Sequence, residues 1–260
     1  MDRFFIQLEY NGTKYHGFQK QSKTTKTIQY YLDKALTKIA NHKVITTCCG
    51  RTDSGVHALN QFVHFDTNSL REIDAWVNGV NANLPDDIAV KNFYKVDKNY
   101  HARFNATSRE YLYLIKNTKT PPAIGFNNCL WIKQTLNTER MEKAAKHLIG
   151  EKDFSAFRAS GCQSKSPVRE IIKTKIYRKG EYIYFLIKGN AFMLNMVRII
   201  MGTLLDVGIN KISIGDFKEI IKKKNRKNAG KTISPKGLYF LGPEYNDLDY
   251  RKEVILNELD

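Results

Sequence analysis

One carboxylate, Asp53, stands between two glycines in the segment GRTDSGVHA, residues 50–58. Gly50 and Gly55 allow backbone angles that other residues resist, so the segment predicts a tight loop that holds the carboxylate up from a sheet edge. An aspartate in such a turn most often only bonds to its own backbone. The other reading is chemical: an exposed, fixed carboxylate can act as a nucleophile or a general base, with Arg51 two residues before it.

Arg198 lies in the mostly apolar segment Phe192–Val207, which predicts a buried helix. A buried, unpaired guanidinium costs several kcal/mol, so Arg198 either finds a carboxylate or reaches solvent at the helix edge. If it is buried, we expect the partner in the other half of the chain, and Asp53 is the natural candidate. Such a pair would keep Asp53 ionised and oriented.

Tyr111 lies in a segment that reads as a strand, Arg109–Asn117. Aromatic residues are common in strands, so Tyr111 can be an ordinary packing residue. It can also be a flat surface on which a nucleobase stacks, as in many nucleic-acid sites.

The first half of the chain predicts the element order β-α-β-β-α-β. Residues Arg3–Tyr10 alternate, with Phe4, Ile6, Leu8 and Tyr10 on one face, which predicts a half-buried strand. Helices are expected over Thr27–Ala40 and around Ile73–Val80, and further strands over Val44–Cys49, Gln61–Asp66 and Ile88–Val96.

The second half repeats this plan loosely. Strands are expected over Arg109–Asn117, Glu170–Tyr177, Glu181–Lys188 and Gly237–Leu241, and helices around Met141–Leu148, Phe192–Val207 and Phe217–Ile221. Two such units imply an α+β fold with two antiparallel sheets, each carrying helices on one face. The boundary is expected within 98–108, and sheets joined edge to edge would leave a long cleft between the halves.

The charge balance predicts a polyanionic partner. The chain of 260 residues has 42 Lys and Arg against 26 Asp and Glu, a net charge of +16. Nucleic acid is favoured over a membrane because no basic amphipathic helix with an apolar face is evident. The densest basic run is Lys222–Lys231, which is either a flexible loop or a phosphate-contacting one.

The remaining composition points to a cytoplasmic protein. The four cysteines lack the spacing of a zinc site or a disulfide framework, and the N-terminus lacks the apolar stretch of a signal peptide. The most apolar segment, Ala191–Ile209, contains Asn195, Arg198 and Asp206, so a buried core helix is expected rather than a membrane span.

Nine motifs, in one order over residues 3–245, resemble the TruA family of tRNA pseudouridine synthases. They are YNGTKYHGFQ (10–19), GRTDSGVHA (50–58), QFVHFDT (61–67), NANLPDDIAV (81–90), YHARFNATSREYLY (100–113), DFSAFRASGC (153–162), SPVREI (166–171), NAFMLNMVRIIMG (190–202) and SPKGLYF (234–240). A single motif would be weak evidence, whereas nine in order are specific.

The resemblance implies two ferredoxin-like, RRM-like halves that share an extended antiparallel sheet, with helices on one face and a basic central cleft. The expected halves are 1–104 and 105–245, followed by a tail, 246–260. It implies a homodimer that isomerises uridine to pseudouridine at positions 38, 39 and 40 of the tRNA anticodon arm. The reaction is neither redox nor group transfer, and the chain shows no nucleotide-cofactor or metal motif, so no cofactor and no metal are expected.

The resemblance also assigns roles to five residues. Asp53 is the catalytic aspartate, Tyr111 the stacking tyrosine, and Arg198 the arginine partner of the aspartate. Arg51 is the loop arginine beside the flipped base, and Leu238 is an apolar wall of the uracil pocket. Four other positions, Ser54, Leu194, Asn195 and Ile199, depart from the commoner family pattern. They bear on substrate preference and on hydrogen bonds around the site rather than on the reaction.

Two other functions are compatible with part of the sequence. A non-catalytic RNA-binding module would explain the charge and the sheets, but not a glycine-framed carboxylate where phosphate would bind. A glycoside hydrolase would use a carboxylate at an anomeric carbon, but such enzymes typically need two carboxylates. For the isomerase, the residues leave open whether Asp53 attacks C6 or C1′ or removes a 2′ proton, and whether Asp53 or Tyr111 mediates proton loss from C5.

Overall fold

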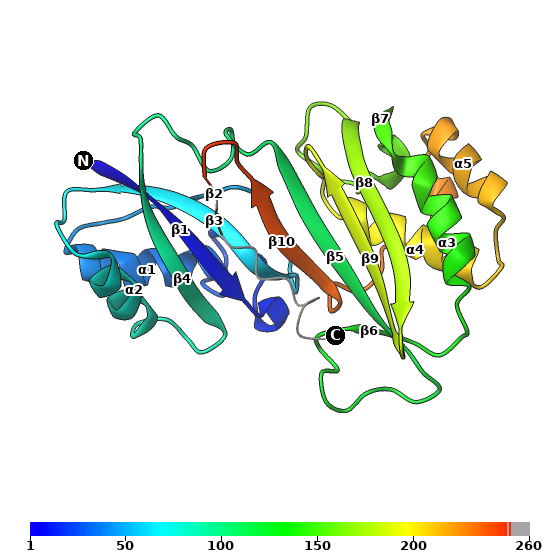
Figure 1. Cartoon of the computed structure of the whole chain (residues 1–260), viewed down its shortest axis with the longest axis horizontal. Coiled ribbons are helices and arrows are strands. Elements are labelled where there is room, and N and C mark those ends of the chain that lie inside the picture. The colour runs from blue at the N-terminus through cyan, green and yellow to red at the C-terminus, as the bar shows by residue number, and fades with distance from the viewer. Residues whose placement is uncertain (249, 251–260) are drawn as a thin grey trace. The chain divides into compact units, whose positions relative to one another are not determined.

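The computed structural model describes residues 1–248 and 250, and the chain divides into two compact units (Figure 1). Unit 1 comprises residues 1–107 and the chain from residue 240 onward, and unit 2 comprises residues 108–239. Strand β10 (Leu238–Glu244) therefore begins in unit 2 and ends in unit 1. Most of the expected tail, 246–260, lies outside the described residues.

Unit 1 has the predicted element order, with helices α1 and α2 packed side by side (Figure 1). Its strands pair antiparallel in the spatial order β4-β1-β3-β2, and Ile6 of β1 faces Val63 of β3 and Phe93 of β4. The elements are β1 (Asp2–Tyr10), α1 (Ile28–Ala40), β2 (Thr47–Cys48), β3 (His57–Thr67), α2 (Ile73–Asn81) and β4 (Ile88–Val96).

The prediction that β1 is half-buried is wrong, because both of its faces are covered. On the helix side, Phe4 packs with Trp76 of α2 at a ring distance of 6.2 Å. On the other side, Phe5 is fully buried, and the rings of Tyr100 and Tyr245 cover it at 5.2 and 5.5 Å. Segments that close over a sheet from distant parts of the chain leave no signal in the alternation of the strand itself.

Strand β2 is shorter than the predicted Val44–Cys49, and α1 explains why. The N–H of Val44 donates to the Thr37 hydroxyl at 3.0 Å, and the N–H of Thr46 donates to the Asp33 carboxylate at 3.0 Å. These two amides therefore bond to helix side chains, and only Thr47–Cys48 pairs with β3.

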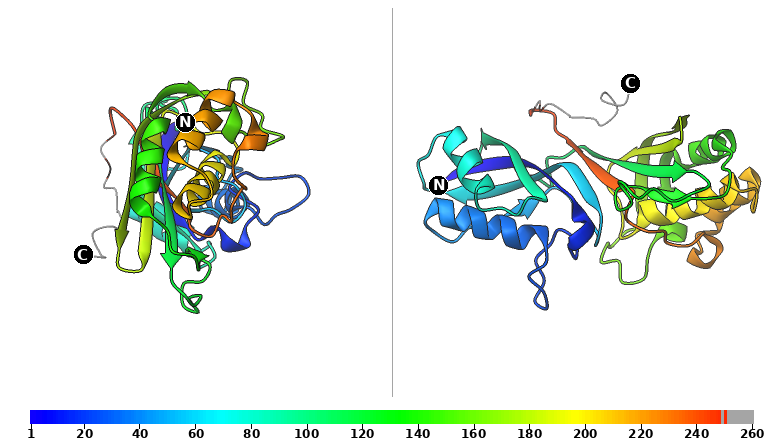
Figure 2. Two further views of the ribbon diagram at one scale, coloured as in Figure 1. Left: turned by 90° about the vertical axis from the view of Figure 1, so that its right-hand side faces the viewer. Right: turned by 90° about the horizontal axis from the view of Figure 1, so that it is seen from below.

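Unit 2 is built on strands in the order β5-β9-β8-β7, all paired antiparallel, while short β6 pairs parallel to β5. Its three helices pack against one another (Figure 2). The elements are β5 (Ser108–Asn117), β6 (Leu130–Ile132), α3 (Thr138–Ala145), β7 (Gly150–Asp153), β8 (Val168–Lys179), β9 (Tyr182–Gly189), α4 (Met196–Gly208) and α5 (Ile214–Lys223). The short strands β6 and β7 were not predicted, whereas the hairpin of β8 and β9 around Gly180 was.

Helix α4 begins at Met196, four positions after the predicted start at Phe192. Its N-cap, Asn195, has a φ of 58°, a left-handed conformation that cannot lie inside a right-handed helix. Nearly all of α4 is buried, as expected for a core helix. Within the described residues, no helix is both long and apolar enough to cross a membrane.

Candidate active site

Asp53 lies in the loop between β2 and β3 of unit 1, where the sequence predicts it. The carbonyl of Asp53 accepts a hydrogen bond from the N–H of Val56 at 3.2 Å, which closes a tight turn. Gly55, inside this turn, has a φ of 77°, as its glycine suggests, but Gly50 lies outside the left-handed region. The carboxylate side chain is half-buried, and Thr52 before it is buried.

Two glycines from the segment after β1 lie directly against this loop. A Cβ on Gly12 would lie 2.0 Å from the carbonyl oxygen of Val56, and one on Gly17 would lie 2.7 Å from that of Thr52. Gly17 also has a φ of 90°, which side chains rarely tolerate. Only glycine at these two positions lets the segment approach the loop so closely.

Backbone hydrogen bonds tie the same segment to the Asp53 loop. The N–H of Phe18 donates to the carbonyl of Thr52 at 3.1 Å, and the N–H of Gly55 donates to the carbonyl of Tyr15 at 3.2 Å. The Ser54 hydroxyl also donates to the Tyr15 carbonyl, at 3.1 Å. The loop on both sides of Asp53 is therefore anchored to residues 15–18, which we call the cradle together with Gly12.

Buried polar side chains also support the Asp53 loop. The Tyr10 and Thr52 hydroxyls share a hydrogen bond of 2.8 Å, and the Gln61 amide donates to the Gly50 carbonyl at 2.8 Å. Burial raises the pKa of the Tyr10 phenol well above its usual range, so it stays neutral. These contacts fix the backbone at both ends of the segment Gly50–Thr52 that leads to the carboxylate.

Arg51, two residues before Asp53, has an exposed side chain. Its positive charge favours the thiolate of Cys48, although burial dominates and raises the pKa of that thiol to about 11. The loop thus carries an arginine and an aspartate two residues apart, the arginine exposed and the aspartate half-buried.

Tyr111 lies in β5 of unit 2, opposite Ile187 of β9. Its side chain is 9% exposed, and the ring of Phe192 meets it edge-on at a centroid distance of 5.1 Å and an angle of 79°. Phe192 comes from the turn that precedes α4, so the late start of this helix brings an aromatic ring to the strand.

Arg198 is half-buried on α4, and its guanidinium is oriented by two oxygen atoms. Its Nε donates to the carbonyl of Ile233 at 2.7 Å, and its Nη1 donates to the Asn195 side chain at 2.5 Å. These contacts use two of its five N–H groups. The left-handed conformation of Asn195 thus places an amide beside the guanidinium, a relationship that the sequence did not reveal.

Leu238 is 4% exposed and begins β10, directly after a turn in which its N–H donates to the carbonyl of Pro235 at 2.8 Å. This turn also contacts β5: the Tyr113 hydroxyl donates to the Ser234 carbonyl, and the N–H of Leu114 donates to the Gly237 carbonyl at 2.8 Å. A Cβ on Gly237 would lie 2.3 Å from the Leu114 carbonyl oxygen, so only glycine fits there.

The predicted site residues therefore fall into two groups. Asp53 and Arg51 share a loop of unit 1, whereas Tyr111, Arg198 and Leu238 belong to unit 2. In unit 2, Arg198 and the turn before Leu238 are joined through Ile233. The ion pair between Arg198 and Asp53 would link the two units and remains a prediction.

The cradle residues were missed as functional residues. Their signal was the motif YNGTKYHGFQ (10–19), whose two glycines lie five residues apart between aromatic residues. The motif supports the resemblance, but nothing in its spacing says that it packs beneath a loop forty residues later.

The basic run Lys222–Lys231 is not a uniform flexible loop. Its first residues form the last turn of α5, where Lys222 lies 2.8 Å from Glu219, and Lys224 lies 3.2 Å from Asp153. Arg226 donates to the Gly230 carbonyl at 3.0 Å and so closes the following turn. Lys223, Lys227 and Lys231 of this run are exposed.

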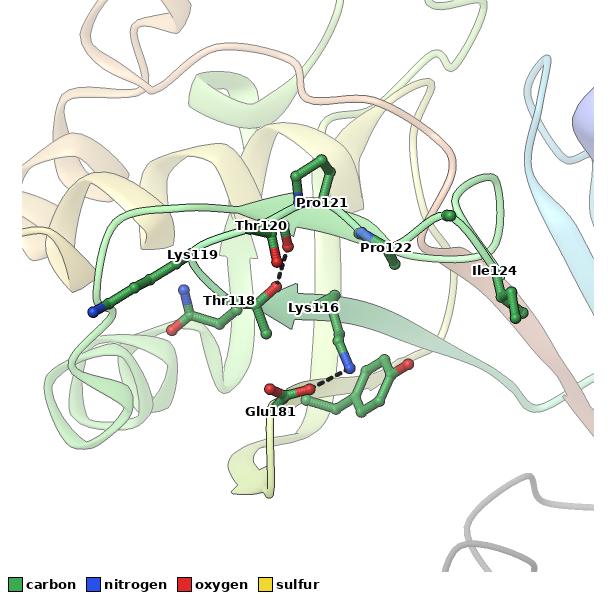
Figure 3. Close-up of a pocket in the computed structure, with 11 residues that line it drawn as sticks. Lys116, Thr118, Lys119, Thr120, Pro121, Pro122, Ile124 and Glu181 are labelled. Atoms are coloured by element: carbon green, nitrogen blue, oxygen red, sulfur yellow. Dashed lines mark hydrogen bonds and ion pairs between the residues drawn. The ribbon is translucent and has the colours of Figure 1, made fainter.

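A hollow of about 840 Å³ lies elsewhere in unit 2, lined by residues 116–124 with Glu181 and Tyr182 (Figure 3). Lys116 Nζ lies 2.6 Å from a Glu181 carboxylate oxygen and 4.2 Å from the centre of the Tyr182 ring. The charge of this lysine is therefore already compensated within the hollow. None of the five predicted site residues is part of its lining.

No group of three or more His, Cys, Asp or Glu side chains that could hold a metal ion occurs in the described part of the chain. None of the four cysteines, all within the described residues, forms a disulfide.

Residues 7–105 and 144–246 match the family model described as tRNA pseudouridine synthase. Proteins named tRNA pseudouridine synthase A are similar over 98% of both chains: the one from Francisella tularensis subsp. holarctica (strain OSU18) is 42% identical, and the one from Francisella philomiragia subsp. philomiragia is 41% identical. A solved structure, the crystal structure of a Cbf5-Nop10-Gar1 complex, matches 78% of this chain and 45% of that chain, with 13% identity and a TM-score of 0.36.

Proposed function

Since the chain belongs to the family of tRNA pseudouridine synthases, we propose that it isomerises uridines 38, 39 and 40 of the tRNA anticodon arm, with Asp53 as the essential carboxylate. The observation that carries this proposal is the Asp53 loop, which the cradle anchors on both sides of the carboxylate. A loop held by backbone contacts positions the residue that carries the carboxylate before the substrate arrives, which a nucleophile or base requires.

In this reaction the N1–C1′ bond of uridine breaks, the uracil turns, and C5 bonds to C1′. C5 loses its proton and N1 gains one, so atoms and electrons balance without a cofactor. Asp53 acts on C6, on C1′ or on the 2′ proton, and each role requires an ionised carboxylate close to the sugar and the base. The half-buried position of Asp53 suits a group that must be fixed and still reach a ligand.

The target base must leave its stack, which costs a few kcal/mol and requires a pocket and phosphate contacts. We assign the pocket to Tyr111 and Leu238, which are both largely covered in unit 2, and the ion pair with Asp53 to Arg198. Arg51 would contact the flipped nucleotide, and the net charge of +16 would supply the phosphate contacts.

The arrangement of the protein is also part of the proposal. The two units would be ferredoxin-like halves that share one sheet and enclose a basic cleft, with the boundary at residues 104–105. Two copies would form a cytoplasmic homodimer whose subunits together build the cleft for the tRNA anticodon arm. The strand order β4-β1-β3-β2 of unit 1 supports the ferredoxin-like assignment of the first half.

Tritium release from tRNA labelled at C5 of uridine tests the function, with wild type and Asp53→Asn measured side by side. C5 loses its hydrogen only if the base is reattached through that carbon. We expect release by the wild type, none by Asp53→Asn, and similar tRNA binding by both. Turnover by the variant would refute the role of Asp53. Binding without release by the wild type would instead favour a non-catalytic RNA-binding module.

A further inference from the structure

Four aromatic rings form a ladder from the core of unit 1 to its surface. Phe5 is fully buried and stacks on His64 at 6.1 Å, and His64 contacts the ring of His101 at 4.4 Å. His101 in turn stacks on Phe104 at 4.3 Å, with only 28° between the ring planes. Phe104, the last ring, is 76% exposed. It belongs to the motif YHARFNATSREYLY (100–113), in which only Tyr111 has a role in the proposed chemistry.

Hydrogen bonds fix the base of this ladder. The N–H of Ala102 donates to His64 Nδ1 at 3.2 Å, and the Tyr245 hydroxyl donates to the Ala102 carbonyl at 2.7 Å. The guanidinium of Arg3 donates to the Tyr100 carbonyl at 3.2 Å. The turn that carries Phe104 is thus held to the face of the sheet opposite α2, the face to which Phe5 also points.

His101 holds the end of the ladder in place. Its Nδ1 accepts from the N–H of Arg103 at 3.0 Å and from the N–H of Phe104 at 3.3 Å, so the imidazole and the backbone of the exposed residue are locked together. The ring of Phe104 has one face against His101, and its aromatic surface is otherwise largely open to solvent. A single exposed apolar side chain is common on protein surfaces, so its exposure alone does not mark a binding site. What distinguishes Phe104 is that stacking and hydrogen bonds hold the exposed ring in one position.

The surroundings favour a nucleobase as the ligand. The guanidinium carbon of the exposed Arg103 lies over the Phe104 ring, 5.9 Å from its centre, so a positive charge accompanies the exposed aromatic ring. A planar ring with a neighbouring cation matches a base and its phosphate, the combination used by single-stranded RNA sites.

We propose that Phe104 is a stacking platform for an unpaired base of the bound tRNA, with Arg103 contacting the adjoining phosphate. This base is not the uridine that reacts. In the proposed function, the reacting uridine stacks on Tyr111. The proposal rests on tRNA as the substrate, but not on the role of Asp53. The platform contributes binding energy and orientation, so Phe104 is a positioning residue.

Equilibrium binding of unmodified tRNA at one fixed salt concentration tests this platform, with Phe104→Ala and Phe104→Trp compared. Base stacking on an aromatic side chain is worth ~1–3 kcal/mol, so Phe104→Ala should bind about 5- to 150-fold more weakly. Phe104→Trp should bind as tightly as the wild type, or more tightly. The matched control is Leu70→Ala, which removes an apolar side chain that is 91% exposed in the same unit and should leave binding unchanged.

Three outcomes would overturn the proposal. The first is unchanged binding by Phe104→Ala, and the second is equal weakening by Phe104→Ala and Phe104→Trp, since a stacking surface tolerates an exchange of aromatic rings. The third is a change of sedimentation coefficient in Phe104→Ala without tRNA, which would assign the ring to a contact between copies of the chain. A failure of Asp53→Asn to abolish turnover would refute the proposed catalysis and leave these binding results intact.

Discussion

Gly17 lies against the carbonyl of Thr52, the residue that precedes Asp53, so closely that a Cβ would be 2.7 Å from the carbonyl oxygen. The same carbonyl accepts from the N–H of Phe18 at 3.1 Å. The position of the carboxylate is therefore determined by a segment that lies some thirty-five residues earlier in the chain. It follows that the loop can be displaced by a change that leaves Asp53 and Arg51 untouched.

We expect Gly17→Ala to lower kcat by at least about 10-fold, with smaller effects on the affinity for tRNA. The added methyl group must push against the Thr52 carbonyl, and misplacement of a catalytic group by about 1 Å can cost 10²-fold in rate. Tritium release at saturating tRNA, together with a binding isotherm, measures the two effects separately.

The control for backbone strain is Gly125→Ala. Gly125 also has a positive φ, 74°, but nothing lies within 4 Å of its added Cβ. This variant should lose about 1 kcal/mol of stability from strain and keep its rate. Equal rate losses in both variants would show that strain, rather than contact with the loop, determines the phenotype of Gly17→Ala.

Arg198→Met should lower activity by about 100-fold, because it removes both the charge and the fork of donors that we assign to Asp53. Arg198→Lys should retain part of the activity, since an ammonium keeps the charge but cannot reproduce the contacts with Ile233 and Asn195 together. The rate and its pH profile are compared with the wild type. A wild-type rate and profile in Arg198→Met would exclude the predicted pair.

The sequence was a good guide to the elements whose pattern depends on local packing. Helix α1 begins one residue after the predicted Thr27 and ends at the predicted Ala40, since its apolar stripe is regular. The start of α4 was missed because it depends on the left-handed backbone of Asn195, and the length of β2 was missed because it depends on hydrogen bonds to Thr37 and Asp33.

In the candidate site, too, local features were predictable and contacts between distant segments were not. The glycine-framed loop around Asp53 was evident from residue types, whereas its support by Gly12 and Gly17 depends on contacts between distant segments. Similarly, the position of Arg198 in an apolar helix indicated that it needs hydrogen-bond partners. It did not indicate that Ile233 and Asn195 would be among them. The sequence indicates that a residue needs a hydrogen-bond partner or a close backbone contact. Which distant residue provides it depends on the fold.

If the exposed lysines of the basic run contact phosphates, Lys223 and Lys227 each contribute to tRNA affinity. The double variant Lys223→Gln, Lys227→Gln should then reduce the slope of log K against log salt by about 1.4 to 1.8, since each phosphate contact contributes about 0.7 to 0.9. Binding of tRNA at several salt concentrations gives this slope.

The control for net charge alone is the double variant Lys34→Gln, Lys43→Gln. It removes two exposed lysines, one within α1 and one just after its end. It should change the slope less. The same reduction in both double variants would contradict a specific contact by the basic run.

Two buried groups of unit 1 should give opposite pH dependences of stability. Burial lowers the pKa of His64 from 6.5 to about 4, so the unfolded chain binds more protons between these values and stability falls as the pH falls through this range. Burial raises the pKa of Asp33 from 3.8 to about 6, so there the folded chain binds more protons and stability rises as the pH falls from about 6 to 3.8. In the wild type the two effects oppose each other.

Conservative variants should separate them in urea unfolding at pH 4.5, 5.5 and 7.5. Asp33→Asn keeps an oxygen for the Thr46 N–H and hydroxyl but no longer buries a charge, so it should be more stable than the wild type by about 2 kcal/mol at pH 7.5, with the gain shrinking toward pH 4.5. His64→Asn keeps an acceptor for the Ala102 N–H and cannot be protonated, so its stability relative to the wild type should increase as the pH falls. If the free energy of unfolding changed with pH in the same way in all three proteins, both assignments would be contradicted. Neither replaced residue would then contribute to the pH dependence of stability.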